Sequence, residues 1–212
     1  MPRKKLIRTN EFPYHITTRT NNKEHFCLNT KQIWTVFIKH LEVLKNDYSC
    51  RIHAFLLMNN HYHLIISTPL QNISESIQHL NGSITRITNK MAKRENHLWG
   101  SRYRWCVINN EKYYWNAVKY VFNNPVRAGL TNYVEDYPYS SLNYQRQELW
   151  EMVDFFHRPM QKIELDKEWL NYQFSKEQNE SIRKGLKKRL FDISPDKNRR
   201  TVELNGAAFF IK

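Results

Sequence analysis

Residues 58–68 read Met58-Asn59-Asn60-His61-Tyr62-His63-Leu64-Ile65-Ile66-Ser67-Thr68, and two histidines stand two positions apart in this stretch. From His61 onward it is rich in residues that favour strands, and residues two apart on a strand point to the same face of a sheet. We therefore expect His61 and His63 side by side on one face, with Leu64 and Ile66 on the opposite face, in a core. Two imidazoles placed in this way can share one divalent metal ion, but the spacing also fits two polar residues on a half-buried surface.

The sequence around this stretch alternates between strand and helix patterns. The expected elements are a strand over Phe12–Thr20, a helix from Asn29 or Thr30 to about Asn46, strands over Cys50–Met58 and His61–Thr68, a helix from about Ser74 to Lys93, and a strand over Arg102–Ile108. A β-α-β-β-α-β order favours an α+β fold, a ferredoxin-like antiparallel sheet with both helices on one face. The other face is then left open, and the strand that carries His61 and His63 is central in it.

A third helix is expected from about Glu111 to Asn124, because Pro125 disfavours helical backbone at the residue before it. Tyr120 and Asn124 are one helical turn apart. If this helix packs over the open face, a phenol and an amide oxygen meet the two histidines. Neutral imidazoles and the Asn124 oxygen could then hold Mg²⁺ or Mn²⁺, while the Tyr120 oxygen attacks a phosphodiester. The alternative for Tyr120 is a surface aromatic.

The composition describes a basic protein rich in aromatic residues. The chain has 212 residues, with 33 Lys and Arg against 20 Asp and Glu, a formal net charge of +13 and 14% aromatic residues. Cations follow phosphates and rings stack on unpaired bases, so we expect single-stranded nucleic acid as a partner. The alternative is a basic soluble protein with an aromatic core.

Two classes of protein are disfavoured by the sequence. It contains no apolar run long enough to span a membrane and no apolar segment behind the basic N-terminus, so neither a membrane span nor a secretion signal is expected. Cys27, Cys50 and Cys106 are scattered, which argues against a disulfide framework or a zinc knuckle and fits the reducing cytoplasm.

Several segments together resemble one family. The three longer ones are His53-Ala54-Phe55-Leu56-Leu57-Met58-Asn59-Asn60-His61-Tyr62-His63-Leu64, His97-Leu98-Trp99-Gly100-Ser101-Arg102-Tyr103 and Lys119-Tyr120-Val121-Phe122-Asn123-Asn124-Pro125-Val126-Arg127-Ala128-Gly129-Leu130. Two shorter ones are Tyr14-His15-Ile16-Thr17 and Tyr137-Pro138-Tyr139-Ser140-Ser141. In this order they resemble the REP-associated tyrosine transposases of the single-tyrosine, IS200-like HUH (His-hydrophobic-His) superfamily. Asn59 departs from the common Pro and Tyr139 from the common Trp.

The resemblance implies a fold, an activity and a set of site residues. The fold is the ferredoxin-like sheet. The metal ligands fall on His61, His63 and Asn124, with Mg²⁺ or Mn²⁺ as the cofactor, and the nucleophile falls on Tyr120. The implied activity is nicking and rejoining of single-stranded DNA at hairpin-forming palindromes through a covalent 5′-phosphotyrosine. The resemblance also implies action at the bacterial nucleoid and favours a monomer, whereas an exchanged tyrosine helix would require a dimer.

Basic and aromatic residues are expected to contact the DNA. These predicted contacts are Lys4, Lys5, Arg19, Trp99, Arg102, Arg104, Lys119 and Arg127. A solvated N-terminal arm, a structural brace at Arg127 and a core position for Trp99 are the alternatives. His15, His53 and His97 could line the site or serve as hydrogen-bonded structural residues.

The sequence suggests two parts, a transposase domain over 1–145 and a C-terminal basic extension over 146–212. A capping pattern from Ser175 opens a helix expected to run through Ile182, Leu186 and Leu190, with basic residues on its other faces. That helix could grip duplex DNA or be solvated. The apolar end of the chain, Val202–Ile211, is expected to dock.

Two other functions remain open from the sequence. The first is a hairpin DNA or RNA binding module on the same fold, without turnover. The second is a metal-dependent phosphodiesterase that uses water as its nucleophile, although the sequence offers no Asp/Glu cluster suited to two metals.

Overall fold

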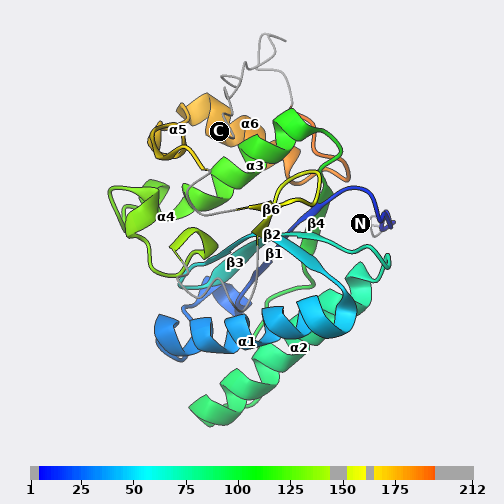
Figure 1. Ribbon diagram of the computed structural model, residues 1–212. Coiled ribbons are helices and arrows are strands. Elements are labelled where there is room, and N and C mark those ends of the chain that lie inside the picture. The colour runs from blue at the N-terminus through cyan, green and yellow to red at the C-terminus, as the bar shows by residue number, and fades with distance from the viewer. Residues whose placement is uncertain (1–4, 144–151, 161–164, 194–212) are drawn as a thin grey trace.

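The computed structural model describes residues 5–143, 152–160 and 165–193, and its central sheet lies between two layers of helices (Figure 1). The strands are β1 (Tyr14–Arg19), β2 (Arg51–Leu57), β3 (His61–Ser67), β4 (Arg104–Val107), β5 (Met152–Val153) and β6 (Pro159–Met160). The helices are α1 (Thr30–Tyr48), α2 (Ile73–Ala92), α3 (Glu111–Phe122), α4 (Asn124–Arg127), α5 (Lys167–Asn171) and α6 (Lys176–Gly185), with short 3-10 turns η1 (Asn21–Lys23), η2 (Val134–Asp136) and η3 (Ser141–Asn143). Helices α1 and α2 cover one face of the sheet, and α3, α5 and α6 lie over the other.

The strand order is β4-β1-β3-β2-β5-β6. The strands from β4 to β2 pair antiparallel in the predicted ferredoxin-like order, which confirms the fold. The prediction of a purely antiparallel sheet is wrong at one edge, where β5 runs parallel to β2 and β6 pairs with β5. Strand β2 would otherwise present an unpaired edge, and strands as short as β5 and β6 carry no alternating pattern that a sequence could reveal.

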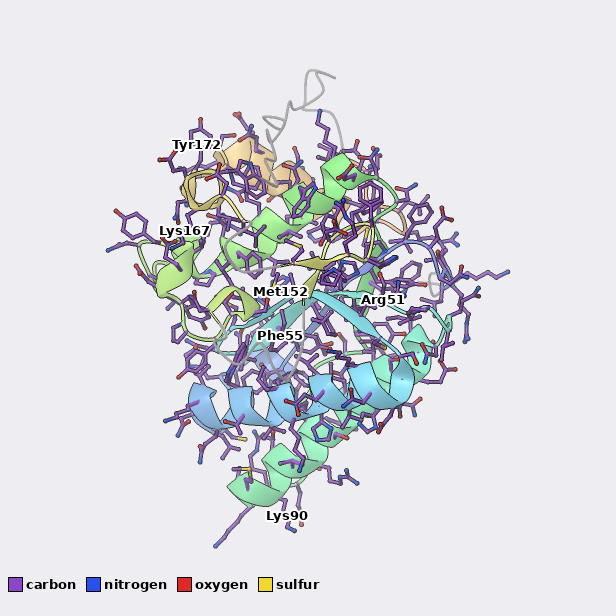
Figure 2. All side chains as sticks on the ribbon, viewed as in Figure 1. Arg51, Phe55, Lys90, Met152, Lys167 and Tyr172 are labelled. Carbon is purple, nitrogen blue, oxygen red and sulfur yellow. The ribbon has the colours of Figure 1, made fainter. Side chains whose placement is uncertain are left out.

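The alternation of β3 separates two cores. Tyr62, Leu64 and Ile66 face the core beneath α1 and α2, whereas Ile65 belongs to the core beneath α3. This confirms that Leu64 and Ile66 lie opposite the two histidines. Phe55 of β2 belongs to the first core and points toward α1, where its ring lies 5.4 Å from the ring of Trp34 (Figure 2).

Helix α1 begins where its capping residues predict. The Asn29 side chain accepts from the backbone of Gln32, and the Gln32 side chain accepts in return from the backbone of Asn29. The helix ends at Tyr48, two residues beyond the predicted end, and Ser49 follows it in the left-handed conformation that commonly closes helices. Its apolar stripe packs on the sheet and on α2.

The helix that carries Tyr120 ends close to the predicted break. Helix α3 begins after Asn110, whose side chain accepts from the backbone of Tyr113. It ends at Phe122, and the short α4 begins at Asn124 with Pro125 in its first turn, where a missing N–H is tolerated. Tyr120 and Asn124 therefore lie on either side of this junction, over the sheet face that carries His61 and His63.

The described C-terminal elements pack on the same layer as α3. Helix α6 contacts α3, and Ile182 and Leu186 enter the core beneath α3. The predicted continuation of this helix to Leu190 is wrong, because α6 ends at Gly185. A side chain at Gly185 would lie 2.7 Å from the backbone oxygen of Asp192, so the chain turns back closely at this point. It then runs beside β4, with Leu190 bridged to Val107.

Within the described ranges, no helix has the length and apolar character needed to cross a membrane. The expected docking of Val202–Ile211 lies outside the described residues.

Candidate active site

His61 and His63 line a pocket of about 460 Å³ that lies on the α3 side of the sheet. Their ring centroids are 5.1 Å apart. Strand β1 extends the same wall of the pocket, since Thr17 is paired with His63 and Arg19 with His61 in the sheet. The alternation of β3 thus brings both imidazoles to one cavity, as the sequence predicted.

The imidazoles of His61 and His63 are both oriented by a hydrogen-bond partner at Nδ1. The Nδ1 of His61 lies 2.7 Å from the Asn60 carboxamide oxygen, and the Nδ1 of His63 lies 2.9 Å from the Nε2 of His15. Each Nε2 is therefore the nitrogen left to face a ligand in the pocket. A partner on the second ring nitrogen is the usual support of a metal-binding histidine.

Burial keeps the imidazoles neutral. It lowers the pKa of His61 to about 3, with the positive Arg19 adding to the shift. Burial also lowers the pKa of His63 well below its usual value, assisted by the neighbouring His61 and His15 and by positive Arg127 and Arg19. Neutral imidazoles are the form that binds metals.

Asn124 presents its oxygen to the same pocket. Its side-chain NH₂ donates to the backbone oxygens of Tyr120, at 2.8 Å, and Val121, at 3.2 Å. The carboxamide oxygen is the atom left for another partner. Two neutral imidazoles and one amide oxygen fit Mg²⁺ or Mn²⁺ with several positions left for water and phosphate oxygens. No group of three or more His, Cys, Asp and Glu side chains suited to a metal occurs in the described part of the chain.

Tyr120 is buried against one of these ligand candidates. Its ring meets the ring of His63 edge-on, with centroids 6.1 Å apart at 87°. The guanidinium of Arg127 lies 4.9 Å from the centre of the Tyr120 ring. The structure therefore brings together His61, His63, Tyr120 and Asn124, the residues predicted as metal ligands and nucleophile.

A ring of cations surrounds these groups. The predicted DNA-contact residues that line the pocket are Arg19, Arg102, Arg104 and Arg127. Arg183 of α6 and Lys187, just after that helix, also line it; the sequence offered them only as basic residues of a helix that could grip duplex DNA or be solvated. The basic face of the helix was visible in the sequence, but its proximity to Tyr120 depends on the packing of α6 on α3. His15 is the third histidine of the pocket, and its pKa is lowered to about 4 by burial.

Three of the predicted DNA contacts do not line this pocket, and Lys4 lies outside the described residues. Lys5 is exposed at the start of the described chain. Trp99 lies on the α2 side of the sheet, where its indole N–H donates to the backbone oxygen of Asn81. Lys119 is only 2% exposed and cannot reach the surface of the pocket.

Lys119 instead occupies an aromatic cage supplied by the C-terminal extension. Its ammonium lies 4.8, 5.2 and 4.7 Å from the rings of Trp169, Tyr172 and Phe174. Burial lowers the pKa of Lys119 to about 8, and the acidic Asp166 opposes the shift. The residue that precedes Tyr120 therefore fastens α3 to the segment around α5, which lies in the upper layer marked by Lys167 and Tyr172 in Figure 2.

The two remaining histidines named from the sequence lie elsewhere. His53 is buried between Ser67, 2.7 Å from its Nε2, and Tyr114, 3.3 Å from its Nδ1. This is the structural alternative stated for it. His97 is exposed and lines a separate groove beside α2.

Comparisons with known proteins place the chain in a family. A family model described as "Transposase IS200 like" matches residues 8–124. A curated protein of Haemophilus influenzae, named as a REP-associated tyrosine transposase, is 29% identical over 101 residues, which cover 42% of this chain and 57% of that relative. The match thus spans little more than half of the relative's length.

A solved structure has a similar fold. It is described as a REP-associated tyrosine transposase bound to a REP hairpin, and it has a TM-score of 0.58 at 20% sequence identity. The alignment covers 79% of this chain and 96% of that chain. The likeness therefore extends beyond the residues matched by the family model.

Proposed function

The chain belongs to the IS200-like transposase family, and we propose that it nicks single-stranded DNA beside a hairpin and becomes covalently joined to the DNA on the 5′-phosphate side of the cut through Tyr120. The observation that carries the proposal is the convergence of His61, His63, Tyr120 and Asn124 in one cation-lined pocket. A hairpin is the proposed partner because the structural neighbour is described as bound to a REP hairpin.

His61, His63 and Asn124 would hold the divalent metal, Mg²⁺ or Mn²⁺. When bound, the ion would polarise the scissile phosphate and offset the charge that develops on its oxygens. His15 and Asn60 would support this site by fixing the Nδ1 side of each ligand ring, so that each Nε2 stays directed into the pocket.

Tyr120 would supply the nucleophile. Its phenolic oxygen loses its proton and forms a bond to phosphorus as the bond between phosphorus and the 3′-oxygen breaks. The leaving 3′-oxygen takes up a proton and ends as a hydroxyl. The phosphate becomes a diester of tyrosine, so its energy is retained. A 3′-hydroxyl can therefore attack the same phosphorus later and rejoin a strand while Tyr120 regains its proton.

The cations of the pocket would hold the phosphate in place for this attack. Arg127 lies over the Tyr120 ring, and Arg183 reaches the pocket from α6. Positive charges in a partly enclosed site stabilise a phosphoryl group more strongly than charges in open solvent. Because Tyr120 packs against His63 of its own chain, one copy contains every proposed catalytic group, and we propose that a monomer suffices.

The proposal is tested with a denaturing gel. Purified protein is incubated with Mn²⁺ and labelled single-stranded oligonucleotides that carry the palindromes flanking its gene. We expect a labelled band shifted by the mass of the protein, lost in EDTA and absent from Tyr120→Phe, while gel-shift binding by that variant persists.

Other outcomes of the same gel distinguish the alternatives. Cleavage that survives Tyr120→Phe but not His61→Ala would replace the covalent mechanism with attack by water. Metal-independent binding without nicking of any palindrome would favour the binding module.

A further inference from the structure

A second groove lies beside the candidate active site and is not explained by the chemistry proposed for Tyr120. It has a volume of about 710 Å³ and runs between α2 and residues 97–103. Asn81, Gly82 and Arg86 line it from α2, and Trp99, Arg102 and Tyr103 line it from the opposite side. We propose that this α2 groove binds unpaired nucleotides of the DNA strand that enters the active-site pocket.

The α2 groove is continuous with the pocket that contains Tyr120. Ser101 and Arg102 line both cavities. A strand that leaves the pocket across Ser101 and Arg102 therefore enters the groove directly. The path of the strand from the pocket into the groove rests on the proposed function. The ability of the groove to bind unpaired nucleotides does not depend on that function.

Aromatic side chains give the groove the surface on which bases stack. Trp99 is half-buried and held rigidly, since its indole N–H donates to Asn81 at 3.1 Å. The rings of Phe26 and Tyr62 also meet it edge-on, both with centroids at 5.8 Å. Tyr103, also half-buried, forms a second aromatic wall. Rings fixed before binding lose little freedom when a base stacks on them, and stacking tolerates any base.

Cations along α2 supply partners for the phosphates. Arg86 lines the groove, and Lys90 follows one helical turn later on the same face of the helix. Lys90 extends from the far end of α2 in Figure 2, away from the sheet. Together with Arg102 at the junction, these residues form a basic track that starts at the active-site pocket.

Gly82 provides the room for a strand to approach the helix. A Cβ at this position would meet no heavy atom within 4 Å, so the open space is not used for packing within the protein. Glycine inside a helix is less favourable than alanine, and glycine elsewhere allows ligands to approach a backbone closely. The same space makes Gly82 a position where a larger side chain can block the groove without disturbing the fold.

The experiment uses the full chain and a labelled oligothymidylate of roughly ten nucleotides. Binding is followed by fluorescence anisotropy for wild type, Gly82→Gln and Arg86→Gln. Lys167→Gln is the control for charge, because Lys167 is exposed on α5, across the sheet from α2. Thermal unfolding checks that Gly82→Gln is at least as stable as wild type.

We expect Gly82→Gln to bind the oligothymidylate at least tenfold more weakly, and Arg86→Gln to bind it more weakly with a smaller salt dependence. Lys167→Gln should bind like wild type. An oligothymidylate that carries 5-iodouracil should crosslink under light to Trp99 or Tyr103. Wild-type affinity in Gly82→Gln, or crosslinks confined to residues outside 97–103 and α2, would overturn the proposal.

Failure of this inference can be distinguished from failure of the proposed nicking. A covalent adduct at Tyr120 with no crosslink in the groove would refute the groove and leave the nuclease intact. Crosslinks to Trp99 in a protein that forms no covalent DNA adduct in the presence of any divalent metal would refute the nuclease and leave the groove intact.

Discussion

The sequence alone could predict that Tyr120 and His63 share one site, but it could not predict all of their neighbours. The His-x-His spacing on a strand was enough to place both imidazoles on one face, and the structure confirms that placement. The role of His15 was left open, because its contact with His63 joins β1 to β3 across 48 positions of sequence. Lys119 was predicted to contact DNA but is buried. The aromatic rings that bury it lie about fifty residues later in the sequence, so no local pattern reveals them.

His15 is expected to act by positioning His63. Replacing it with Phe removes the contact to Nδ1 and should weaken Mn²⁺ binding by roughly 10- to 100-fold, the usual cost of losing such a partner. His15→Gln, which can still hydrogen-bond, should keep most of the affinity. Titrating cleavage against Mn²⁺ measures both variants, and equal affinities for Phe, Gln and wild type would show that His63 needs no such support.

Among the elements, the long regular helices and strands could be predicted from the sequence. The end of α6 and the short strands β5 and β6 could not. Helix α1 and strand β3 are long enough to show their periodicity and caps. Helix α6 was predicted from its capping box, but its end depends on the close return of the chain at Gly185, which no local pattern reveals. Strand β5 covers the edge that β2 would otherwise leave unpaired, and β6 pairs with β5.

Helix α6 carries a prediction of its own, because it brings Arg183 to the pocket. Arg183→Gln should lower the rate of cleavage by roughly 10- to 100-fold. This is at or below the lower end of the loss, about 100- to 1000-fold, that follows removal of one charge-stabilising donor. Lys184→Gln is the matched control, since Lys184 is the next residue, equally basic, and exposed. Single-turnover cleavage at saturating protein measures the chemical step, and similar rates for the two variants would remove Arg183 from the mechanism.

At the scale of the whole molecule, the described C-terminal elements extend along both edges of the ferredoxin-like sheet. Strand β5 pairs with β2, and the backbone of Val107 in β4 exchanges hydrogen bonds with Arg189 and Phe191. The family resemblance was confirmed by the family model over residues 8–124. The sequence motifs could not predict this arrangement, because pairing along a distant edge leaves no signal in either segment alone. The division into domains at 145 and 146 stays a prediction.

Buried neutral histidines should make the whole fold sensitive to acid. Burial lowers the pKa of His53 to about 3 and that of His15 to about 4, against about 6.5 in an unfolded chain. Between these values the unfolded chain binds more protons, so stability is complete above about pH 6.5 and is lost as the pH falls. Together, protonation of the two residues should lower the free energy of unfolding by about 3 kcal/mol between roughly pH 6.5 and 5.

Urea unfolding in EDTA at several pH values measures this dependence. His53→Gln should make the slope shallower by about 1.4 kcal/mol per pH unit, because one proton-binding difference is removed. A free energy of unfolding that does not change over this range would mean that His53 and His15 are not buried as neutral groups.

Covalent attachment of Tyr120 to DNA is the step on which the proposed function depends. The most direct measurement is peptide mass spectrometry after incubation with Mn²⁺ and a cleaved palindrome, followed by nuclease and trypsin digestion. Cleavage after Lys119 and Arg127 isolates Tyr120 from Tyr113 and Tyr114. We predict a nucleotide attached through its 5′-phosphate to the tyrosine of the peptide Tyr120–Arg127. An adduct on another tyrosine, or cleaved DNA with every tyrosine unmodified, would show that Tyr120 is not the nucleophile.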